Sequence, residues 1–239
     1  MKRRLLNEAE AETIGEAVRL RLERVLHDGD LNTPMASFSA KMATFATHLA
    51  LWGQKINLTA APTDPDEILF HVMDSLAPIS IAAKQTDSIL ARALAPGRRL
   101  IDIGSGAGFP GLILAAATQI ETTLVESRRK RASFLEAASL AMGLFDVTVA
   151  QSRITPASVS RGFDLITVRA VGVSPEFFTI ASAALRPGGV AIAYLSAGQE
   201  VDREAAESAG LAELSSARYD MSRGDKRVAR ILALWLKES

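Results

Sequence analysis

A glycine-rich turn near the middle of the chain carries the clearest chemical signal in the sequence. The segment 102–111 reads DIGSGAGFPG and stands between a buried-strand pattern, RRLIDIG, and an apolar helical pattern over 112–117. Glycines at alternate positions let the backbone turn sharply and approach a ligand closely. The start of the following helix offers unpaired N–H groups and a partial positive charge. We therefore expect a nucleotide-type ligand to bind there, at the carboxyl ends of the strands.

Glu126 is the second candidate ligand-binding residue, at the end of the strand pattern ETTLVES (121–127). A carboxylate at this place can accept hydrogen bonds from the 2′- and 3′-hydroxyls of a ribose. An acidic residue about 20 positions after a glycine turn belongs to the pattern of nucleotide-type sites. The pattern predicts that Glu126 binds ribose, and a solvated strand-end carboxylate is the plainer alternative.

Two classes of cofactor fit this layout. The segment GAGFPG (106–111) satisfies G-x-G-x-x-G, the dinucleotide fingerprint, so an NAD-dependent oxidoreductase is one hypothesis. Against it, Asp102 and Gly104 already open the turn, so the fingerprint starts late after the strand, and no apparent set of residues for hydride transfer follows. The pattern D-x-G-x-G-x-G with PGG (187–189) before the fifth strand is typical of class I methyltransferases. The sequence therefore favours S-adenosylmethionine as the cofactor.

The residue types narrow the methyl acceptor by elimination. The chain has no cysteine, so it lacks the covalent nucleophile that methylation at pyrimidine C5 requires. Enzymes acting on exocyclic amines usually carry Asn/Asp-Pro-Pro-aromatic after the fourth strand, where this chain reads TVRA (167–170). A hydroxyl acceptor usually needs a general base, and no persuasive lysine or histidine set is present. Guanine N7 carries no proton at neutral pH, so alignment alone can promote its methylation. The sequence favours that acceptor.

Two groups of cations are candidates for contact with a nucleic acid. Arg169 stands where the fourth strand delivers residues to the cofactor crevice, and we predict that it positions the reacting base or binds a phosphate. Arg128, Arg129, Lys130 and Arg131 open a helix, where cations oppose the helix dipole, which favours a phosphate contact over a merely solvated face. Lys+Arg and Asp+Glu both number 27, so positive potential has to be local.

Alternating periodicities indicate the elements that position these residues. The expected helices cover 8–27, 35–52, 68–76, 112–117, 128–144, 177–185 and 202–209. The expected strands cover 98–104, 121–127, 146–152, 163–170, 190–195, 214–219 and 227–238. Pro78 is expected to end the third helix and PGG (187–189) the sixth.

This order predicts an α/β fold of the Rossmann-like class I methyltransferase type. We expect a mostly parallel seven-stranded sheet with helices on both faces, closed by an antiparallel edge. An N-terminal helical extension (1–90) would pack on the methyltransferase domain (91–239).

Composition bounds the remaining possibilities. A hydrophobic content of 48% and a charged content of 23% describe an ordinary globular chain. The absence of cysteine excludes a disulfide framework and thiolate zinc sites, and we predict no metal site. No long apolar run predicts a membrane span, and the start turns acidic too early for a secretory signal. We expect a cytoplasmic, monomeric protein.

Motifs beyond the glycine turn resemble a known family. They are Trp52, KINLTA (55–60), His71 with DSL (74–76), DIGSGAGFPG (102–111), LVES (124–127) with Phe134-Leu135, Arg153, Arg169-Ala170 and PGG (187–189). In this combination the chain resembles the RsmG family, also called GidB, of bacterial 16S ribosomal RNA guanine-N7 methyltransferases. The joint presence of Asn-Leu-Thr, His-x-x-Asp-Ser-Leu and this glycine turn is much more specific than the turn alone.

The resemblance implies S-adenosylmethionine as donor and a guanine in the 530 loop of 16S ribosomal RNA as acceptor, in RNA or in a small-subunit particle. The cofactor-binding residues that we predict from the motifs and this resemblance are Gly104, Gly106, Phe109, Glu126, Ile154, Thr155 and Arg169. Lys55, in the N-terminal extension, joins the four cations at 128–131 as a candidate RNA-binding residue.

Some positions depart from the family or have no assigned role. Ile154 and Thr155 replace the usual Ala-Glu pair and lose a carboxylate, Val168 replaces a serine, and YLSA (194–197) lacks the usual lysine. These changes leave open an RNA-binding protein of this fold without turnover. The motif residues without a role are Asn57, Thr59, His71 and Asp74. A hydrogen bond between the last two, a helix cap beneath the site, and direct contact with cofactor or base are equally open.

Overall fold

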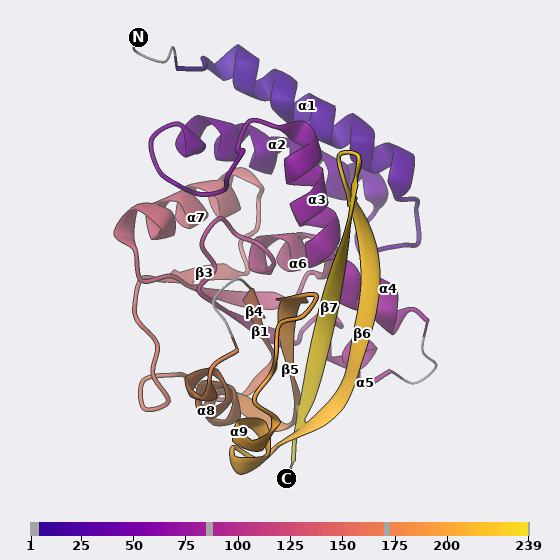
Figure 1. Cartoon of the computed structure of the whole chain (residues 1–239). Coiled ribbons are helices and arrows are strands. Elements are labelled where there is room, and N and C mark those ends of the chain that lie inside the picture. Colours follow the sequence, from indigo (N-terminus) through magenta and orange to yellow (C-terminus); the bar gives the residue numbers. More distant parts are fainter. Residues whose placement is uncertain (1–4, 85–87, 170–172, 239) are drawn as a thin grey trace.

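The computed structural model describes residues 5–84, 88–169 and 173–238 (Figure 1). Five helices precede the first strand: α1 (Glu8–Val25), α2 (Met35–Gly53), α3 (Pro65–Ser75), α4 (Ala77–Ala82) and α5 (Ile89–Ala93). The later helices are α6 (Gly111–Thr118), α7 (Arg129–Ala141), α8 (Pro175–Ala184) and α9 (Arg203–Ser208). The strands are β1 (Arg99–Ile103), β2 (Glu121–Val125), β3 (Val147–Ala150), β4 (Phe163–Arg169), β5 (Leu185–Ser196), β6 (Leu211–Arg223) and β7 (Lys226–Lys237).

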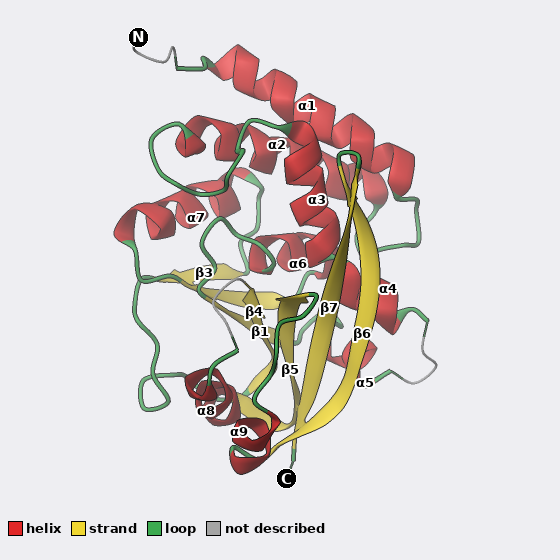
Figure 2. Cartoon of the chain, in the orientation of Figure 1, coloured by secondary structure: helices red, strands yellow, loops and turns green. Residues whose placement is uncertain are grey.

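The strands form one seven-stranded sheet in the order β3-β2-β1-β4-β5-β7-β6 (Figure 2). The pairs from β3 to β5 are parallel, and β7 pairs antiparallel with both β5 and β6. The mostly parallel sheet with an antiparallel edge is confirmed. Parallel order brings the carboxyl ends of β1, β2, β4 and β5 to one edge, where the glycine turn follows β1.

Helices cover both faces of this sheet, as the sequence predicts. Alternate residues of the central strands pack into different clusters, because side chains along a strand point to opposite faces. Leu100 and Leu165 lie in the cluster that includes α4, α5 and Leu114 of α6, whereas Ile101 and Ile166 pack against α8. In Figure 2, α6 and α7 lie above the sheet and α8 and α9 lie below it.

The N-terminal helices form a second layer over α6 and α7. Phe38, Met42, Phe45 and Leu49 of α2 are fully buried, which confirms the apolar stripe. Burying each such side chain contributes roughly 1.5–3 kcal/mol relative to exposure. Phe45 meets the ring of Phe109 edge-on at 5.1 Å, so this layer contacts the glycine turn directly.

Several boundaries differ from the prediction for identifiable reasons. The third helix begins earlier, because the Asp64 side chain caps it by accepting from the backbone N–H of Asp66, 2.9 Å away. Pro78 does not stop the helical path: it lies in the first turn of α4, where a missing N–H costs little. The segment 187–189 does not end α8 either. It lies inside β5, where a register shift between Phe163 and Leu165 accommodates the irregular start.

Strand β6 is longer than predicted, β7 has the predicted length shifted by one residue, and the short helices α4 and α5 were missed. Strands β6 and β7 have 13 and 12 residues and form a long hairpin whose turn lies beside α3 (Figure 1). The five-residue helix α5 is too short to show a periodicity. Ala170, expected at the end of β4, lies outside the described residues. Within the described ranges, none of the helices has the length and apolarity that a membrane crossing requires.

Candidate active site

The glycine turn has the backbone conformation that its sequence requires. Gly104, Gly106 and Gly108 have φ of 70°, 54° and 88°, in the left-handed region that favours glycine. The N–H groups of Gly104 and Ser105 both donate to the carbonyl oxygen of Val125, at 2.9 and 3.0 Å. These two bonds attach the turn to the end of β2, and a third, from the N–H of Gly108 to the carbonyl oxygen of Ser105 at 2.7 Å, closes it internally.

Gly111 serves packing rather than turning. A Cβ atom there would lie 2.4 Å from Leu124 Cδ2 and 2.7 Å from Asp102 Oδ2. Only a residue without a side chain lets α6 begin this close to β1 and β2, which places the amino end of the helix beneath the glycine turn.

Glu126 holds the turn from the other side. Its buried carboxylate accepts from the backbone N–H of Gly106 at 3.0 Å and from that of Arg128 at 2.7 Å. Each oxygen therefore uses one lone pair for the protein backbone and retains another. The ribose contact predicted for Glu126 would have to use these remaining lone pairs.

A cavity of about 290 Å³ opens beside the turn, on the α8 face of the sheet. Its walls include Gly104, Val125, Ser127, Ile154 and Phe177. Apolar walls with a few polar edges suit an adenosyl group. The structure therefore brings Gly104 and Ile154 to one cavity, at the edge where the carboxyl ends of β1, β2 and β4 meet.

The other predicted cofactor-binding residues do not line this cavity: Gly106, Phe109, Glu126, Thr155 and Arg169. Thr155 forms a local turn, in which its backbone N–H donates to Ser158 Oγ at 2.9 Å. The ring of Phe109 is buried and contacts Phe45, His71 and Arg169. A cofactor contact by Phe109 would thus involve its backbone rather than its ring.

Arg169 lies on the opposite face of the sheet from the cavity, in a cluster centred on Asp74. Its Nη1 donates to Asp74 Oδ2 at 3.1 Å, and its guanidinium lies over the Phe109 ring at 5.0 Å. Arg230 donates to the same carboxylate through Nε and Nη2 at 3.1 and 3.0 Å, and the Tyr219 hydroxyl donates at 2.7 Å. Burial raises the pKa of Asp74, but the hydrogen bond from Arg230 and the charge of Arg169 outweigh it and lower the pKa below its ordinary value.

His71 extends the cluster without touching Asp74. Arg169 Nη1 lies 3.4 Å from His71 Nδ1, and His71 Nε2 lies 3.3 Å from Glu67 Oε1. A guanidinium can only donate, so Nδ1 accepts and the proton sits on Nε2, facing the carboxylate. Burial, followed by the charge of Arg169, lowers the pKa of His71 to about 4. Of the open alternatives, the direct bond between His71 and Asp74 is wrong, because Arg169 stands between them.

Glu67, Tyr219, Arg223 and Arg230 are site residues that the sequence reasoning missed. Arg223 Nε donates to Glu67 Oε2 at 2.7 Å and closes the cluster on the hairpin side. The signal that could have found Arg230 is a charged residue inside the apolar run of the last strand, VARILALWL (228–236).

Asp102 lies beneath the same region. It is 1% exposed, and its Oδ1 accepts from the Thr167 hydroxyl at 2.7 Å. Burial raises the pKa of this carboxyl. Asp102 therefore links β1 to β4 below the glycine turn and does not reach the cavity.

The basic residues at the start of α7 divide into two kinds. Arg128, Arg129 and Lys130 are exposed, as is Lys55. Arg131 instead donates through Nε and Nη2 to the carbonyl oxygen of Asn57, at 3.2 and 2.9 Å. Arg131 therefore ties the loop after α2 to the rim of the glycine turn, and three of the four cations remain solvent-facing.

Asn57 and Thr59 lie in this tied loop. The Asn57 side chain is exposed, while Thr59 Oγ1 is buried without a hydrogen-bond partner among the described residues. No group of three or more His, Cys, Asp or Glu side chains is placed to hold a metal ion in the described part of the chain.

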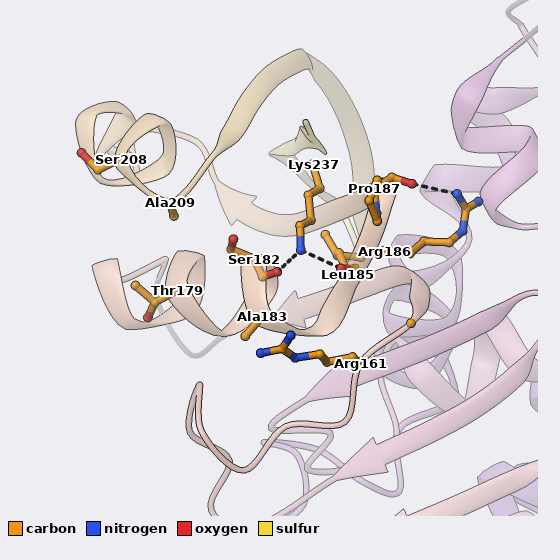
Figure 3. A pocket seen from close by; sticks show the side chains of 11 residues that line it. Arg161, Thr179, Ser182, Ala183, Leu185, Arg186, Pro187, Ser208, Ala209 and Lys237 are labelled. Atoms are coloured by element: carbon orange, nitrogen blue, oxygen red, sulfur yellow. Dashed lines mark hydrogen bonds between the residues drawn. The ribbon is translucent and has the colours of Figure 1, made fainter. Parts of the chain in front are cut away.

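A larger cavity, of about 660 Å³, lies at the opposite end of the strands (Figure 3). Figure 3 shows Lys237 Nζ donating to the carbonyl oxygens of Ser182 and Leu185, at the carboxyl end of α8. A helix C-terminus carries a partial negative charge that this ammonium offsets. The amino ends of β4 and β5, next to Arg161 and Arg186, are thus a packing region, and the smaller cavity is the candidate site.

Comparison with known proteins identifies a family. The family model GidB, rRNA small subunit methyltransferase G, matches residues 39–226. The ribosomal RNA small subunit methyltransferase G of Sorangium cellulosum is 36% identical over 178 residues, which cover 72% of this chain and 70% of that protein. The protein of the same name from Nitrosomonas europaea is 31% identical over 167 residues, covering 67% and 72%. The residues matched by the family model include the glycine turn and the loop after α2.

Solved structures share the fold at low identity. A precorrin-6y C5,15-methyltransferase from Geobacter metallireducens aligns with a TM-score of 0.51 at 13% identity, over 62% of this chain and 87% of that one. A methyltransferase from Pyrococcus furiosus aligns with a TM-score of 0.50 at 18% identity, over 68% and 83%. They support the class I methyltransferase fold alone.

Proposed function

The chain belongs to the GidB family of rRNA small subunit methyltransferases G, and we propose that it methylates N7 of a guanine in the 530 loop of 16S ribosomal RNA with S-adenosylmethionine as donor. The observation that carries the proposal is the glycine turn with its cavity at the carboxyl ends of β1, β2 and β4. The substrate is 16S RNA or a small-subunit particle, and the protein acts in the cytoplasm as a monomer.

The residues around the cavity fit the proposed donor. Gly104 and Gly106 give a ligand access to the backbone, Ile154 and Val125 offer apolar contact to an adenine, and Glu126 retains lone pairs for ribose hydroxyls. Thr155 contributes through the conformation of its turn. The bound donor supplies an electrophilic methyl group on a sulfonium.

Among the described residues, the site offers no candidate general base for the reaction. His71 is neutral near pH 7, but Arg169 and Glu67 engage both of its ring nitrogens. Asp102 is buried below the turn and holds Thr167. An acceptor that needs no deprotonation, such as guanine N7, suits a site that works by alignment.

Arg169 and the exposed cations would serve the RNA. Within the described residues, Nε and Nη2 of Arg169 make no hydrogen bond, and neither is a fully buried atom, so water reaches them. These N–H groups are available to the donor or to the reacting base. Lys55 and the exposed cations at 128–130 would bind phosphates at the rim.

We also infer that the helical extension (1–90) and the methyltransferase domain (91–239) build the site together. Asp74 and His71 come from the extension, while Arg169 comes from β4. The extension is therefore expected to be needed for methyl transfer, and not only for RNA affinity.

The direct test is transfer of a labelled methyl group from S-adenosylmethionine to small-subunit particles that lack the modification, followed by mapping of the modified base. Label on N7 of a guanine in the 530 loop supports the proposal, and label on another atom, or none, refutes it. In parallel, S-adenosylmethionine should raise the melting temperature and NAD should not. Donor binding without transfer would favour an RNA-binding protein that keeps the fold.

A further inference from the structure

A single buried carboxylate joins three distant parts of the chain. Asp74 of α3 accepts hydrogen bonds from Arg169 at the end of β4, from Arg230 of β7 and from Tyr219 of β6. The exposed fraction is 1% for the Asp74 side chain, 12% for Arg169 and 13% for Arg230. Two arginines are thus held almost out of water by one acid.

Burying such a cluster of charges contributes little to the stability of a fold. Desolvation of buried ions can exceed their mutual attraction, and apolar residues of similar size often stabilise as well or better. Among the ion pairs of the described residues, three arginines, Arg169, Arg223 and Arg230, share the two carboxylates of Asp74 and Glu67, and Arg169 also acts through its charge on the buried Asp102. The arrangement of the cluster therefore calls for a role beyond stability.

The hydrogen bonds of Arg169 indicate that role. Its contacts with Asp74 and His71 both use Nη1, and the Phe109 ring covers one face of the guanidinium. Among the described residues its Nε and Nη2 groups have no hydrogen-bond partner, and neither is a fully buried atom. Asp74 fixes the guanidinium at one corner and leaves the donors at the other corners for a ligand.

The C-terminal hairpin completes the arrangement through its register. Tyr219 and Arg230 stand directly opposite each other in the β6–β7 pairing, so both side chains reach Asp74 from one place on the hairpin. Tyr219 and Arg230 Nε donate to Oδ1, while Arg169 and Arg230 Nη2 donate to Oδ2. The hairpin therefore fixes the carboxylate that fixes Arg169.

We propose that Asp74 is a positioning residue for methyl transfer, which orients Arg169 and is itself held by the hairpin residues Arg230 and Tyr219. The inference rests on the proposed function, because Arg169 has to serve the methyl-transfer reaction. It assigns a role to the motif acid and gives the C-terminal hairpin a part in the active site.

The experiment is a double-mutant cycle on the single-turnover rate of methyl transfer, with donor and small-subunit particles saturating. Asp74→Asn should lower the rate of the otherwise unchanged protein about 100-fold, the cost of a displaced catalytic-site group. In an Arg169→Ala background the same substitution should cost less than about threefold, because a residue that acts through Arg169 has nothing left to position. A merely structural role would give equal losses in both backgrounds.

Asp164→Asn is the matched control. Asp164 is also a buried acid shared by two arginines, Arg98 and Arg186, but it lies at the amino end of β4. It should lower stability and leave the single-turnover rate of the folded protein nearly unchanged. Arg230→Gln and Tyr219→Phe keep the carboxylate and should reduce the rate by roughly tenfold and threefold, again only when Arg169 is present.

These milder variants carry the cycle if Asp74→Asn does not fold. Equal losses with and without Arg169, or equal effects of Asp74→Asn and Asp164→Asn, would overturn the inference. A wild-type protein that transfers no methyl group to the guanine would instead refute the proposed function, so the two failures are distinguishable.

Discussion

The two ends of strand β4 each carry a buried acid shared by arginines, but the two clusters differ in depth. At the amino end, Asp164 accepts from Arg98 at 3.3 Å and Arg186 at 2.6 Å, and these arginines are 43% and 41% exposed. At the carboxyl end, the arginines that bind Asp74 are 12% and 13% exposed. The same residue types thus meet water at one end and are largely removed from it at the other.

The exposure of the arginines bears on which end of the sheet is functional. Half-exposed arginines keep most of their hydration, so their pairs cost little and contribute little. Nearly buried arginines lose hydration that the ion pairs only partly restore. The larger cavity, about 660 Å³ against 290 Å³, lies at the amino end, so cavity size alone does not select the cavity beside the glycine turn. The two cavities are distinguished by the burial of the charged side chains near them and by whether they lie at the amino or the carboxyl ends of the strands.

The largest effect is expected when the same backbone strain is introduced at the two ends of the parallel strands. Gly104 and Gly188 have φ of 70° and 74°, so a valine at either position should destabilise the fold by roughly 1–3 kcal/mol. Only Gly104→Val should also abolish donor binding, because its side chain would enter the space beside the cavity. Calorimetric titration with S-adenosylmethionine measures the difference. Equal donor affinity in both variants would show that the site is misplaced.

A smaller effect is expected at Glu126. Glu126→Gln replaces one acceptor oxygen by an NH₂ group, which must face either the Gly106 or the Arg128 backbone N–H. We expect donor affinity to weaken by roughly 1–3 kcal/mol, through a loosened turn and a lost ribose acceptor. Glu121→Gln, at the exposed start of β2, is the control. A normal dissociation constant for Glu126→Gln would remove Glu126 from the donor site.

The ends should also respond differently to pH. The pKa of His71 is about 4 in the folded chain and ordinarily about 6.5, so the unfolded chain binds the extra proton between these values. Stability should therefore fall as pH drops from 6.5 to 4, by on the order of 2–3 kcal/mol, and His71→Gln should flatten this slope. Asp164 has a lowered pKa, so its contribution is lost only below about pH 4. Denaturant titrations at several pH values measure both windows.

The pH dependence of methyl transfer tests whether a general base takes part in the reaction. Methyl transfer should stay nearly flat between about pH 6 and 9, because His71 is already neutral there. A tenfold step in the single-turnover rate within that range would show that a titrating group takes part.

Local patterns explain what the sequence could predict. The glycine turn, the mostly parallel sheet with its antiparallel edge, and the position of Glu126 at the end of β2 follow from short motifs and from the alternation of strands and helices. The contacts of Asp74 with Tyr219 and Arg230 join residues 145 and 156 positions apart, and they depend on hairpin register and on where α3 docks. No local pattern encodes such a meeting. Even so, every second residue of β4 shares a face, so Arg169 could have been placed with Thr167, away from the cavity wall at Val168.

The basic residues 128–131 differ in whether their side chains are exposed or hydrogen-bonded to the protein, and the sequence does not show this difference. The smallest predicted effect concerns these residues. Arg128 and Arg129 are exposed at the rim of the carboxyl end, whereas Arg131 is engaged with the Asn57 carbonyl. Replacing Arg128 and Arg129 by alanine should lower the salt slope of RNA binding by up to about two units and leave donor affinity unchanged. Arg161→Ala, an exposed cation at the amino end, should leave the slope as it is.

Arg131→Ala provides the contrast within the same helical turn. It should release the loop around Asn57, because the Arg131 guanidinium donates to the carbonyl oxygen of Asn57 and not to a phosphate. The rate of methyl transfer should therefore fall, while the salt slope of RNA binding should change little. Filter binding of RNA fragments at a series of salt concentrations, with transfer measured at the lowest, separates the two effects. If the Arg128 and Arg129 double variant binds like wild type at every salt concentration, those cations are a solvated helix face. The RNA surface would then lie on the extension around Lys55, because phosphate contacts in a chain of zero net charge have to be concentrated somewhere.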